Sequence, residues 1–411
     1  MVPANSLFAL LTLAVSFTGV SAGPVPTSSI ATLPFKRSLR LSSFLDIVKA
    51  DQARARALKS TSGGANNGDA PISIPATNNA VTYTTEIGVG TPPTQYTLLI
   101  DTGSSNTWIG ANKTYTRTIS SVKTANNVSV TYGSGSFNGT EYTDTVTLSP
   151  ELIITKQSIG VASNSTGFDG VDGILGIGPT DLTTDTLSPD TNSTVPAVTD
   201  NLFSQKTIST ETIGISFNPT NTEYQTNGEL TFGGCDSTKF TGEITYTPIT
   251  STSPANQYWG INQTITYGDG TPIFSSSTAG IVDTGTTLLL LATDAFQAYG
   301  NATGGVFNQT TGLFQLTLGQ YSNLESLYFK IGSSTFELPP NGQIFPRSLN
   351  SFFGGDADHV YLIVGDTGTP SGQGLDFLNG YTFLERFYSE YDTTNKRVGL
   401  ATTPFTNATT N

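Results

Sequence analysis

Short runs of alternating polar and apolar residues fill the chain beyond residue 70. Examples are residues 96–100, 128–132 and 229–232, which read Tyr-Thr-Leu-Leu-Ile, Val-Ser-Val-Thr-Tyr and Glu-Leu-Thr-Phe. Runs rich in β-branched and aromatic residues, bounded by Gly, Asn and Asp, are typical of β-strands. Gly268-Asp269-Gly270 and Asn138-Gly139 are predicted hairpin corners. The pattern predicts a mainly β protein with a few short helices, near residues 197–206, 292–301 and 320–328.

The N-terminal region differs from this pattern. Residues 7–15 form an apolar run too short to span a bilayer, and Val20-Ser21-Ala22 is a small-residue cleavage pattern, so residues 1–22 are predicted to be a signal peptide. We therefore expect a secreted protein, with vacuolar residence as the alternative. Nine Asn-x-Ser/Thr sequons support secretion and predict a glycoprotein. They begin at Asn112, Asn127, Asn138, Asn164, Asn192, Asn262, Asn301, Asn308 and Asn407.

A basic leader follows. Leu45, Val48 and the Ala- and Arg-rich residues after them predict a helix, and residues 60–68 resemble a flexible, protease-accessible linker. Residues 1–60 hold seven basic and two acidic side chains, a net charge of +5, whereas residues 61–411 carry −18. Opposite charges favour attraction between leader and body. A disordered basic tail is the alternative interpretation.

The composition excludes several classes of function. The 411 residues include one Cys and one His, so an intrachain disulfide is impossible and a Cys/His metal site is nearly excluded. A Ser-His-Asp or Cys-His enzyme would depend on His359 alone. A net charge of −13 disfavours nucleic-acid binding, and no segment after the leader is apolar enough for a membrane helix. We expect no metal, no cofactor and no membrane or nucleic-acid partner.

An internal repeat carries the candidate chemistry. The residues 98–105, Leu-Leu-Ile-Asp-Thr-Gly-Ser-Ser, recur at 280–287 as Gly-Ile-Val-Asp-Thr-Gly-Thr-Thr. In both copies an apolar strand leads into an aspartate, Asp101 or Asp283, and the following glycine allows a tight turn. The hydroxyl residues can donate hydrogen bonds to the carboxylate. If the two halves pack about a pseudo-twofold axis, the aspartates face each other and share one proton.

These motifs resemble those of the pepsin-like aspartic endopeptidases, most closely the secreted basidiomycete enzymes of the polyporopepsin type. The resemblance covers essentially the whole chain. It implies a bilobal acid protease fold with two pseudo-twofold-related, β-barrel-like lobes and a cleft between them. The implied domains are the signal peptide (1–22), a basic activation prosegment (23–70), an N-terminal catalytic lobe with a flap (71–245) and a C-terminal catalytic lobe (246–411). A cis Thr91–Pro92 bond is also implied.

The resemblance assigns roles to individual residues. Asp101 and Asp283 are the implied catalytic dyad, and their loops are supported by Thr102, Gly103, Ser104, Thr284, Gly285 and Thr286. The flap hairpin matches residues 130–136. The implied flap and substrate-binding residues are Tyr132, Gly133, Ser134, Trp108, Leu99 and Ile174, with the Tyr132 hydroxyl bonded to the Trp108 indole. Asn379 stands where an apolar residue is expected behind Asp283, which questions the packing there.

The expected reaction is acid hydrolysis of peptide bonds by water activated between Asp101 and Asp283, in a monomer that acts on polypeptides. Leu99 and Ile174 predict a preference for large apolar or aromatic side chains around the scissile bond. Ser134, in place of an acidic flap residue, predicts poor cleavage after lysine. We expect an autoactivating zymogen whose prosegment places a lysine such as Lys59 against the dyad. Which aspartate carries the shared proton stays open.

Three other classes of protein remain as alternatives. A catalytically inactive pepsin-like binding protein is disfavoured by the intact Asp101, Asp283 and Tyr132. A glycosidase with paired carboxylates would leave the duplicated Asp-Thr-Gly and the flap unexplained. A secreted cell-wall structural protein suits the Ser/Thr content but predicts no catalysis.

Overall fold

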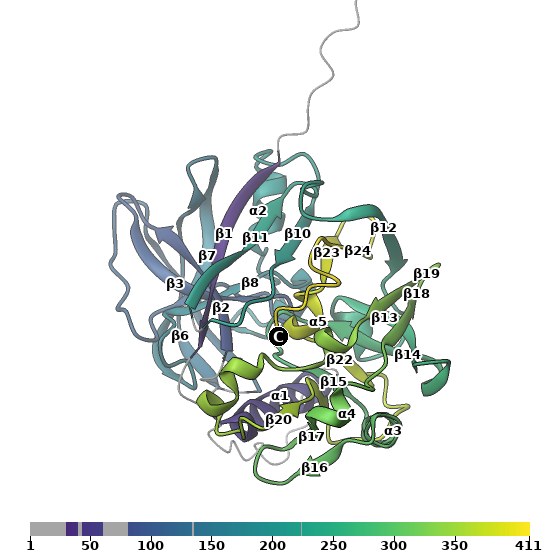
Figure 1. Cartoon of the computed structure of the whole chain (residues 1–411). Coiled ribbons are helices and arrows are strands. Elements are labelled where there is room, and N and C mark those ends of the chain that lie inside the picture. The colour runs from purple at the N-terminus through teal and green to yellow at the C-terminus, as the bar shows by residue number, and fades with distance from the viewer. Residues whose placement is uncertain (1–29, 40–42, 61–80, 134, 223) are drawn as a thin grey trace, which may run out of the picture.

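The computed structural model describes residues 30–39, 43–60, 81–133, 135–222 and 224–411 (Figure 1). Several predictions from the sequence lie outside these residues. They are the signal peptide, the first part of the proposed prosegment, the linker after Ser60 and the flap residue Ser134.

The largest sheet joins both halves of the chain. It contains fourteen strands, which lie side by side in the following order: β12 (Thr241–Pro248), β24 (Arg397–Thr402), β23 (Phe387–Asp392), β10 (Thr212–Phe217), β11 (Tyr224–Phe232), β1 (Ala31–Leu39), β2 (Val81–Val89), β3 (Thr94–Asp101), β8 (Gly173–Gly176), β4 (Trp108–Ile109), β7 (Leu152–Thr166), β6 (Ser136–Ser149), β5 (Val122–Thr131) and β9 (Leu187–Ser188). The predicted lobe boundary at 245/246 falls within β12. The two lobes therefore share a central sheet.

Two smaller sheets belong to the second half. One contains β19 (Ser334–Leu338), β18 (Leu327–Ile331), β13 (Gly260–Tyr267), β14 (Thr271–Val282), β22 (Phe377–Asn379), β15 (Leu289–Leu291) and β21 (Val364–Asp366). The other contains β16 (Val306–Asn308), β17 (Leu313–Thr317) and β20 (His359–Tyr361). Each half repeats one local arrangement, because β3 pairs in parallel with β8 and β14 pairs in parallel with β22. These two pairs lead into the repeated Asp-Thr-Gly motifs.

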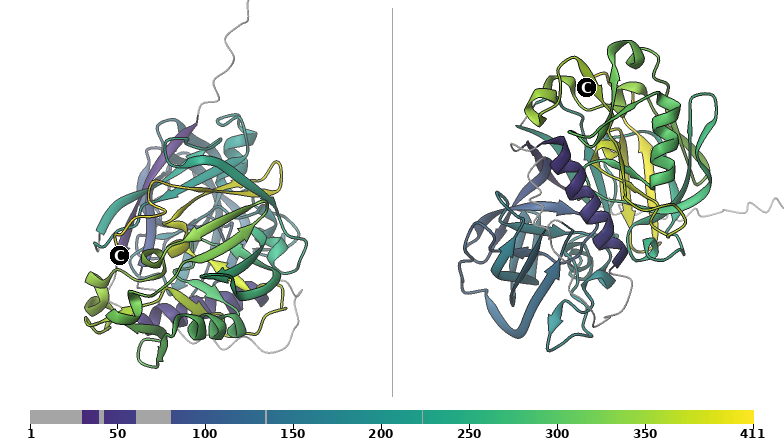
Figure 2. Two further views of the ribbon diagram at one scale, coloured as in Figure 1. Left: turned by 45° about the vertical axis from the view of Figure 1, so that its right-hand side comes forward. Right: turned by 90° about the horizontal axis from the view of Figure 1, so that it is seen from below.

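The α-helices are α1 (Phe44–Ser60), α2 (Val198–Ser204), α3 (Thr293–Thr303), α4 (Leu318–Tyr321) and α5 (Tyr381–Leu384). Helix α1 lies between the two lobes, as the right-hand view of Figure 2 shows. Its buried side recurs at helical spacing and includes Phe44, Ile47, Val48, Asp51, Arg54, Ala55 and Leu58. Phe44 packs against the rings of Phe345, Phe353 and Tyr361 of the second lobe.

The β architecture confirms the predicted fold class, and the helices predicted near 197–206 and 292–301 coincide with α2 and α3. The cis Thr91–Pro92 bond is also confirmed. The corner at Gly268-Asp269-Gly270 joins β13 to β14 as predicted. The helix predicted at 320–328 is wrong, because α4 ends at Tyr321 and β18 begins at Leu327.

The hairpin corner predicted at Asn138-Gly139 is also wrong. Both residues lie within β6, where the pairing with β7 shifts register between them. Gly139 suits this irregularity, because a β-carbon there would lie 1.9 Å from the carbonyl oxygen of Val161. The Asn-Gly pair therefore marks a bulge rather than a turn.

Candidate active site

The two aspartates arrive at the seam between the lobes from equivalent strand ends. Asp101 is the last residue of β3, and Asp283 directly follows β14. Both side chains are fully buried. A β-carbon at Gly103 would lie 2.7 Å from Asp283 Oδ1, and one at Gly285 would lie 2.6 Å from Asp101 Oδ1. Each motif therefore needs its glycine to admit the aspartate of the opposite lobe.

The two loops hold their carboxylates in the same way. The amide of Gly103 donates to Asp101 Oδ1 at 2.9 Å, and the amide of Gly285 donates to Asp283 Oδ1 at 3.1 Å. Ser104 Oγ donates to Asp101 Oδ2 at 2.5 Å, and Thr286 Oγ1 donates to Asp283 Oδ2 at 2.6 Å. These bonds fix both carboxylates in orientation and stabilise negative charge on them.

Thr102 and Thr284 tie one loop to the other. The amide of Thr102 donates to Thr284 Oγ1 at 3.0 Å, and the amide of Thr284 donates to Thr102 Oγ1 at the same distance. Each hydroxyl also donates across the seam, from Thr102 to the Val282 carbonyl and from Thr284 to the Ile100 carbonyl. Four buried bonds thus lock the loops in a symmetric arrangement.

Behind the loops the two lobes differ. In the first lobe the backing strand β8 is apolar, and Ile174 and Leu175 are buried there. In the second lobe the buried Asn379 occupies the equivalent strand β22 and exchanges two amide hydrogen bonds with Gln263, at 3.0 and 3.2 Å. A buried amide is tolerated when its donors and acceptors are paired. The pairing with Gln263 therefore explains how the polar Asn379 is accommodated behind Asp283.

The guanidinium of Arg54, on α1, lies between the two carboxylates. Its Nη2 donates to Asp101 Oδ1 at 2.5 Å and to Asp283 Oδ1 at 2.9 Å, and its Nε donates to Asp283 Oδ2 at 2.6 Å. One nitrogen thus contacts both aspartates, so the two carboxylates face each other across a gap of one polar group. This was the arrangement expected from the repeat.

The basic residue at the aspartates differs from the one that the sequence suggested. Lys59 lies one and a half turns further along α1, and its Nζ donates to Thr369 Oγ1 of the second lobe. Arg54 belongs to the buried stripe of the helix together with Leu58 and Asp51, whereas Lys59 lies beside that stripe. The helical period therefore determines which basic residue reaches the aspartates.

Arg54 and the aspartates alter one another's ionisation. Burial by itself would raise the pKa of Asp283, but Arg54, Thr286 and the Gly285 amide outweigh it and hold that pKa below its usual value. Burial would lower the pKa of Arg54, but Asp101 and Asp283 outweigh it and raise that pKa. With α1 in place, the Arg54 guanidinium therefore stabilises the ionised form of Asp283.

The predicted flap residues gather in a separate apolar cluster over the site. Trp108 stacks on Phe137 with ring centroids 4.2 Å apart, and Phe168 meets both Trp108 and Tyr132 edge-on. Burial and Asp101 raise the pKa of Tyr132, and nearby Trp108 lowers it. The Trp108 indole acts on the Tyr132 hydroxyl as a side-chain hydrogen-bond donor, but neither Trp108 Nε1 nor the hydroxyl makes a hydrogen bond of normal distance and angle among the described residues.

Helix α1 contacts the flap directly. A β-carbon at Gly133 would lie 2.1 Å from the Cα of Arg54, so only a glycine lets the flap approach the helix this closely. Tyr132 and Gly133 therefore face α1 instead of an open cleft. Ser134, the flap residue assigned to lysine discrimination, lies outside the described residues.

Comparisons with known proteins agree with this geometry. Residues 82–403 match the family model for eukaryotic aspartyl proteases. Polyporopepsin from Irpex lacteus is 67% identical over 339 residues, which cover 82% of this chain and 99% of that protein. Human gastricsin is 32% identical over 78% of this chain and 81% of its own length. The chain belongs to the eukaryotic aspartyl protease family.

A solved structure gives the same result for the fold. The crystal structure of the aspartic proteinase from Irpex lacteus superposes with a TM-score of 0.80 and 58% sequence identity, covering 93% of this chain and all of that one. The molecule is thus a bilobal, pepsin-like aspartic endopeptidase that acts on polypeptides. The roles of its individual residues are considered below.

In this aspartic endopeptidase, α1 fills most of the space beside the aspartates. The cavity that remains is only about 70 Å³ and is lined by α1, the first catalytic loop, the flap and the second lobe, through residues that include Leu58, Ser104, Val130, Tyr132, Leu182 and Tyr258. Leu99 and Ile174, the expected pocket residues, do not line it; they pack in the flap cluster instead. Leu182 is a wall residue that motif matching missed, because it lies outside both the repeated loops and the flap, whereas Val130 lies in the matched flap hairpin but was assigned no role.

Helix α1 also contacts the second loop through Asp51, which the sequence analysis did not single out. Its carboxylate accepts hydrogen bonds from the amides of Thr287 and Leu288, at 3.1 and 2.8 Å. Burial raises the pKa of Asp51 to about 7, although these two amides and Arg54 act in the opposite direction. Asp51 and Arg54 are three residues apart, so a single helical face carries both contacts.

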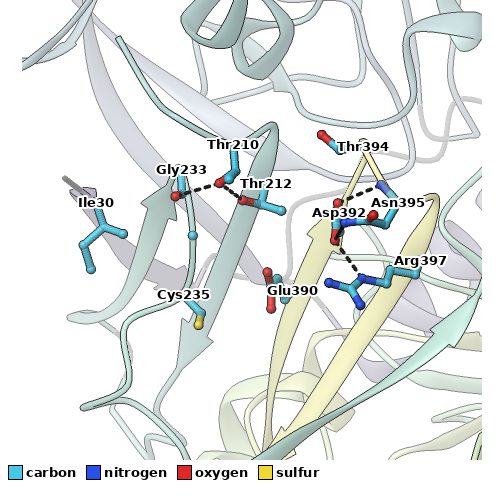
Figure 3. Close-up of a pocket in the computed structure, with 11 residues that line it drawn as sticks. Ile30, Thr210, Thr212, Gly233, Cys235, Glu390, Asp392, Thr394, Asn395 and Arg397 are labelled. Carbon is cyan, nitrogen blue, oxygen red and sulfur yellow. Dashed lines mark hydrogen bonds and ion pairs between the residues drawn. The ribbon is translucent and has the colours of Figure 1, made fainter. Parts of the chain in front are cut away.

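A larger cavity, of about 360 Å³, lies away from the aspartates beside β23 and β24 (Figure 3). Its lining includes Cys235, Glu390 and the ion pair between Asp392 and Arg397. Burial and the nearby Glu390 raise the pKa of the Cys235 thiol, which makes it a poor nucleophile. This cavity therefore has no visible part in peptide hydrolysis.

The described part of the chain shows neither a metal cluster nor a membrane helix. Within these residues no group of three or more His, Cys, Asp and Glu side chains is arranged to hold a metal ion. None of their helices has both the length and the apolar character of a membrane span.

Proposed function

We propose that Asp101 and Asp283 are the catalytic dyad of a secreted acid endopeptidase that is made as an autoactivating zymogen. The observation that carries the proposal is the single guanidinium nitrogen of Arg54 that contacts both buried carboxylates. A polar group of that size fits between them, so a water molecule can take this position after α1 departs. The repeated glycines and hydroxyls hold the carboxylates ready for it.

The reaction follows from two facing carboxylates. Without Arg54, like charges at this distance cannot both persist, so one proton is shared. The ionised carboxylate removes a proton from the water, whose oxygen attacks the peptide carbonyl carbon, while the protonated partner donates its proton to the carbonyl oxygen. The resulting neutral gem-diol collapses as a proton passes to the amide nitrogen, and the amine leaves. Either aspartate can serve as the base.

In the proposed zymogen, α1 is the inhibitory element and Arg54 is its central contact. The pKa of Asp283 is depressed in this state, so the ion pair contributes stability above the usual aspartate pKa and loses it as the pH falls through the depressed value. Release then requires acid. Self-cleavage is expected between residues 60 and 75, which lie outside the described residues.

The substrate is expected to lie extended across both lobes beneath the flap. Val130, Tyr132 and Leu182 offer an apolar wall beside the first catalytic loop, which favours large apolar or aromatic side chains around the scissile bond. Ser134 predicts poor cleavage after lysine, because it provides no negative charge. A Ser134→Asp variant that gains no activity on a lysine-containing peptide would contradict this.

A single chain supplies both aspartates, which favours a monomer. Secretion is supported by the signal-like leader and the sequons. Intact mass of the protein recovered from the culture medium of a fungal host, before and after enzymatic deglycosylation, tests secretion and glycosylation.

The decisive experiment is cleavage of denatured haemoglobin in acidic buffer, with and without pepstatin. We expect pepstatin-sensitive cleavage in the wild type, and a loss of roughly 10³-fold or more in Asp283→Asn. Unchanged cleavage by that variant would overturn the assignment of the dyad. In parallel, the purified full-length chain should be inert at neutral pH and shorten on acidification. An Asp101→Asn chain that still shortens by itself would contradict autoactivation.

A further inference from the structure

A second charged residue of the proposed prosegment is buried in the enzyme body. Arg37 lies on β1, and only 2% of its side chain is exposed. Its Nη1 donates to the Thr220 carbonyl at 2.6 Å and lies 4.0 Å from Glu385 Oε1. The carboxylate of Glu385 is itself 95% buried, and Arg37 is the cation that lies nearest to it.

The surroundings of Glu385 come mostly from the body of the enzyme. Tyr83, on β2, donates its hydroxyl to Glu385 Oε1 at 2.5 Å. The Tyr83 ring packs edge-on against Phe217 and Tyr381, with centroids 4.5 and 5.0 Å away. The three aromatic residues Tyr83, Phe217 and Tyr381 belong to β2, β10 and α5. They therefore remain beside Glu385 when β1 is removed.

The charged and titratable groups that face Glu385 are few. They are Arg37 from β1, Tyr83 from β2 and the adjacent Arg386, while Tyr381 of α5 faces Arg37. The guanidinium of Arg386 is engaged elsewhere, since its Nη1 donates to the carbonyls of Phe405 and Ala408. Burial raises the pKa of Glu385, and Arg37 is the largest influence that opposes this rise.

We propose that Arg37 and Glu385 form a second anchor between prosegment and body, and that its loss on activation leaves Glu385 as the buried carboxyl that confines the mature enzyme to acidic pH. The proposal rests on the proposed zymogen function. It goes beyond the contact at the dyad, because it concerns β1 in the shared sheet rather than α1 in the cleft. It also predicts a loss of stability of the mature enzyme toward neutral pH and assigns that loss to one residue.

The direction of the effect follows from linkage. A carboxyl whose pKa is raised by folding contributes stability below its unfolded value and loses it as the pH rises to the folded value. Removal of Arg37 takes away the main influence that lowers this pKa. The mature enzyme should therefore lose stability over a wider range of rising pH than the precursor does.

Lys36 provides a matched control. It neighbours Arg37 on β1 and pairs with Glu86 at 3.9 Å, but both side chains are about half exposed. An exposed pair at this distance contributes little to stability. A Lys36→Met change therefore removes the same charge from the same strand without uncovering a buried carboxylate.

The first test is a double-variant cycle in the full-length chain at neutral pH, read by thermal unfolding. We expect Arg37→Met to lower Tm by several degrees, Lys36→Met to leave it nearly unchanged, and Arg37→Lys to recover part of the loss. Because Glu385→Gln removes the unpaired charge, Arg37→Met/Glu385→Gln should unfold at a higher temperature than Arg37→Met. Independent, additive effects of the two substitutions would overturn the anchor. The cycle needs no activation, so it is informative even if the chain fails to shorten in acid.

The second test uses the mature enzyme, prepared from the wild-type and Glu385→Gln precursors by acidification or, if that fails, by an added protease that cuts the linker. Each is incubated at neutral pH and assayed afterwards in acid. We expect the half-life of the Glu385→Gln enzyme to be longer by about tenfold, a change equivalent to one pKa unit. Equal half-lives would overturn the role of Glu385. Failure of the wild-type precursor to shorten by itself would instead count against autoactivation.

Discussion

The two Asp-Thr-Gly loops make nearly the same internal contacts but differ in what surrounds them. Each carboxylate receives one bond from a glycine amide and one from a hydroxyl, and the threonines reciprocate across the seam. Outside the loops, the first aspartate is backed by the apolar β8, whereas the second is backed by the Asn379–Gln263 pair. The symmetry is therefore local, and the asymmetry comes from the neighbouring strands.

Helix α1 also makes unequal contacts with the two loops. Arg54 makes two hydrogen bonds to Asp283 but one to Asp101, and Asp51 contacts only the second loop. The helix is thus fixed mainly to the second lobe and reaches the first through a single nitrogen and the flap. The helix therefore contacts the two carboxylates unequally, although the loops themselves hold them alike.

The largest effect is expected from Arg54→Met in the full-length chain. It leaves two facing carboxylates buried without a cation, and breaking such a buried pair costs about 3–5 kcal/mol. Denaturant unfolding at neutral pH should show this loss, and residual peptidase activity should appear there. Arg56→Met is the matched control, because Arg56 is exposed on the same helix. Equal stability of the two variants would show that α1 is held by apolar packing alone.

The next effect concerns the contact that only the second loop makes. The pKa of Asp51 is raised from 3.8 to about 7, so its contribution to stability is present at low pH and is lost as the pH rises through this range. Asp51→Asn should remove a pH dependence worth up to a few kcal/mol. Because the Asn amide nitrogen cannot accept a hydrogen bond, the variant also leaves one of the two loop amides unpaired and should be less stable than the wild type at low pH.

Unfolding free energies of the full-length chain over mildly acidic to neutral pH measure this. The exposed Asp46, on the first turn of α1, provides the control Asp46→Asn. A pH slope that is identical in wild type and Asp51→Asn would show that Asp51 does not titrate in this range.

Asn379→Leu tests the backing of the second loop. It leaves the buried Gln263 amide without its partner, which costs about 1–3 kcal/mol. Asn379→Leu combined with Gln263→Leu should recover much of that loss, since neither amide is then left unpaired. Chemical unfolding of the wild type and both variants gives the comparison. If the double variant is no more stable than the single one, the amide pair has a further role in shaping the Asp283 loop.

The smallest difference is expected between Ser104→Ala and Thr286→Ala. Both remove one hydroxyl donor to a buried carboxylate, so each should reduce kcat by a similar factor of about ten, equivalent to ~1.4 kcal/mol. Steady-state kinetics on one peptide measure the two values. A difference of more than tenfold between them would break the local symmetry and identify the aspartate that depends more on its hydroxyl.

Much of this site was predictable from local sequence. The repeated apolar strand, aspartate, threonine and glycine located both carboxylates, and the Ala- and Arg-rich pattern located α1. The same pattern also held the signal that would have selected Arg54, since residues 47, 51, 54 and 58 share one helical face. The expectation of a lysine such as Lys59 at the aspartates did not use that period.

Other features were not accessible in this way. The Asn138-Gly139 pair is locally a good turn, but both residues pair with β7 inside the long strand β6, and the irregularity is an extra residue, Ser163, on β7 opposite them. Asn379 appeared misplaced until Gln263, 116 residues earlier, was found to pair with it. The Arg37–Glu385 contact joins residues 348 positions apart, and the sequence around either residue does not predict the contact.

By itself, the sequence determined the mainly β fold, the two acidic loops and the presence of a basic helix before them, because these depend on residue spacing within short segments. Only the tertiary structure decided which basic residue meets the aspartates, what supports each loop and which carboxyl the leader neutralises. Those outcomes depend on burial, where the energy of a charge or an amide is set by whichever distant group the fold brings within hydrogen-bond reach.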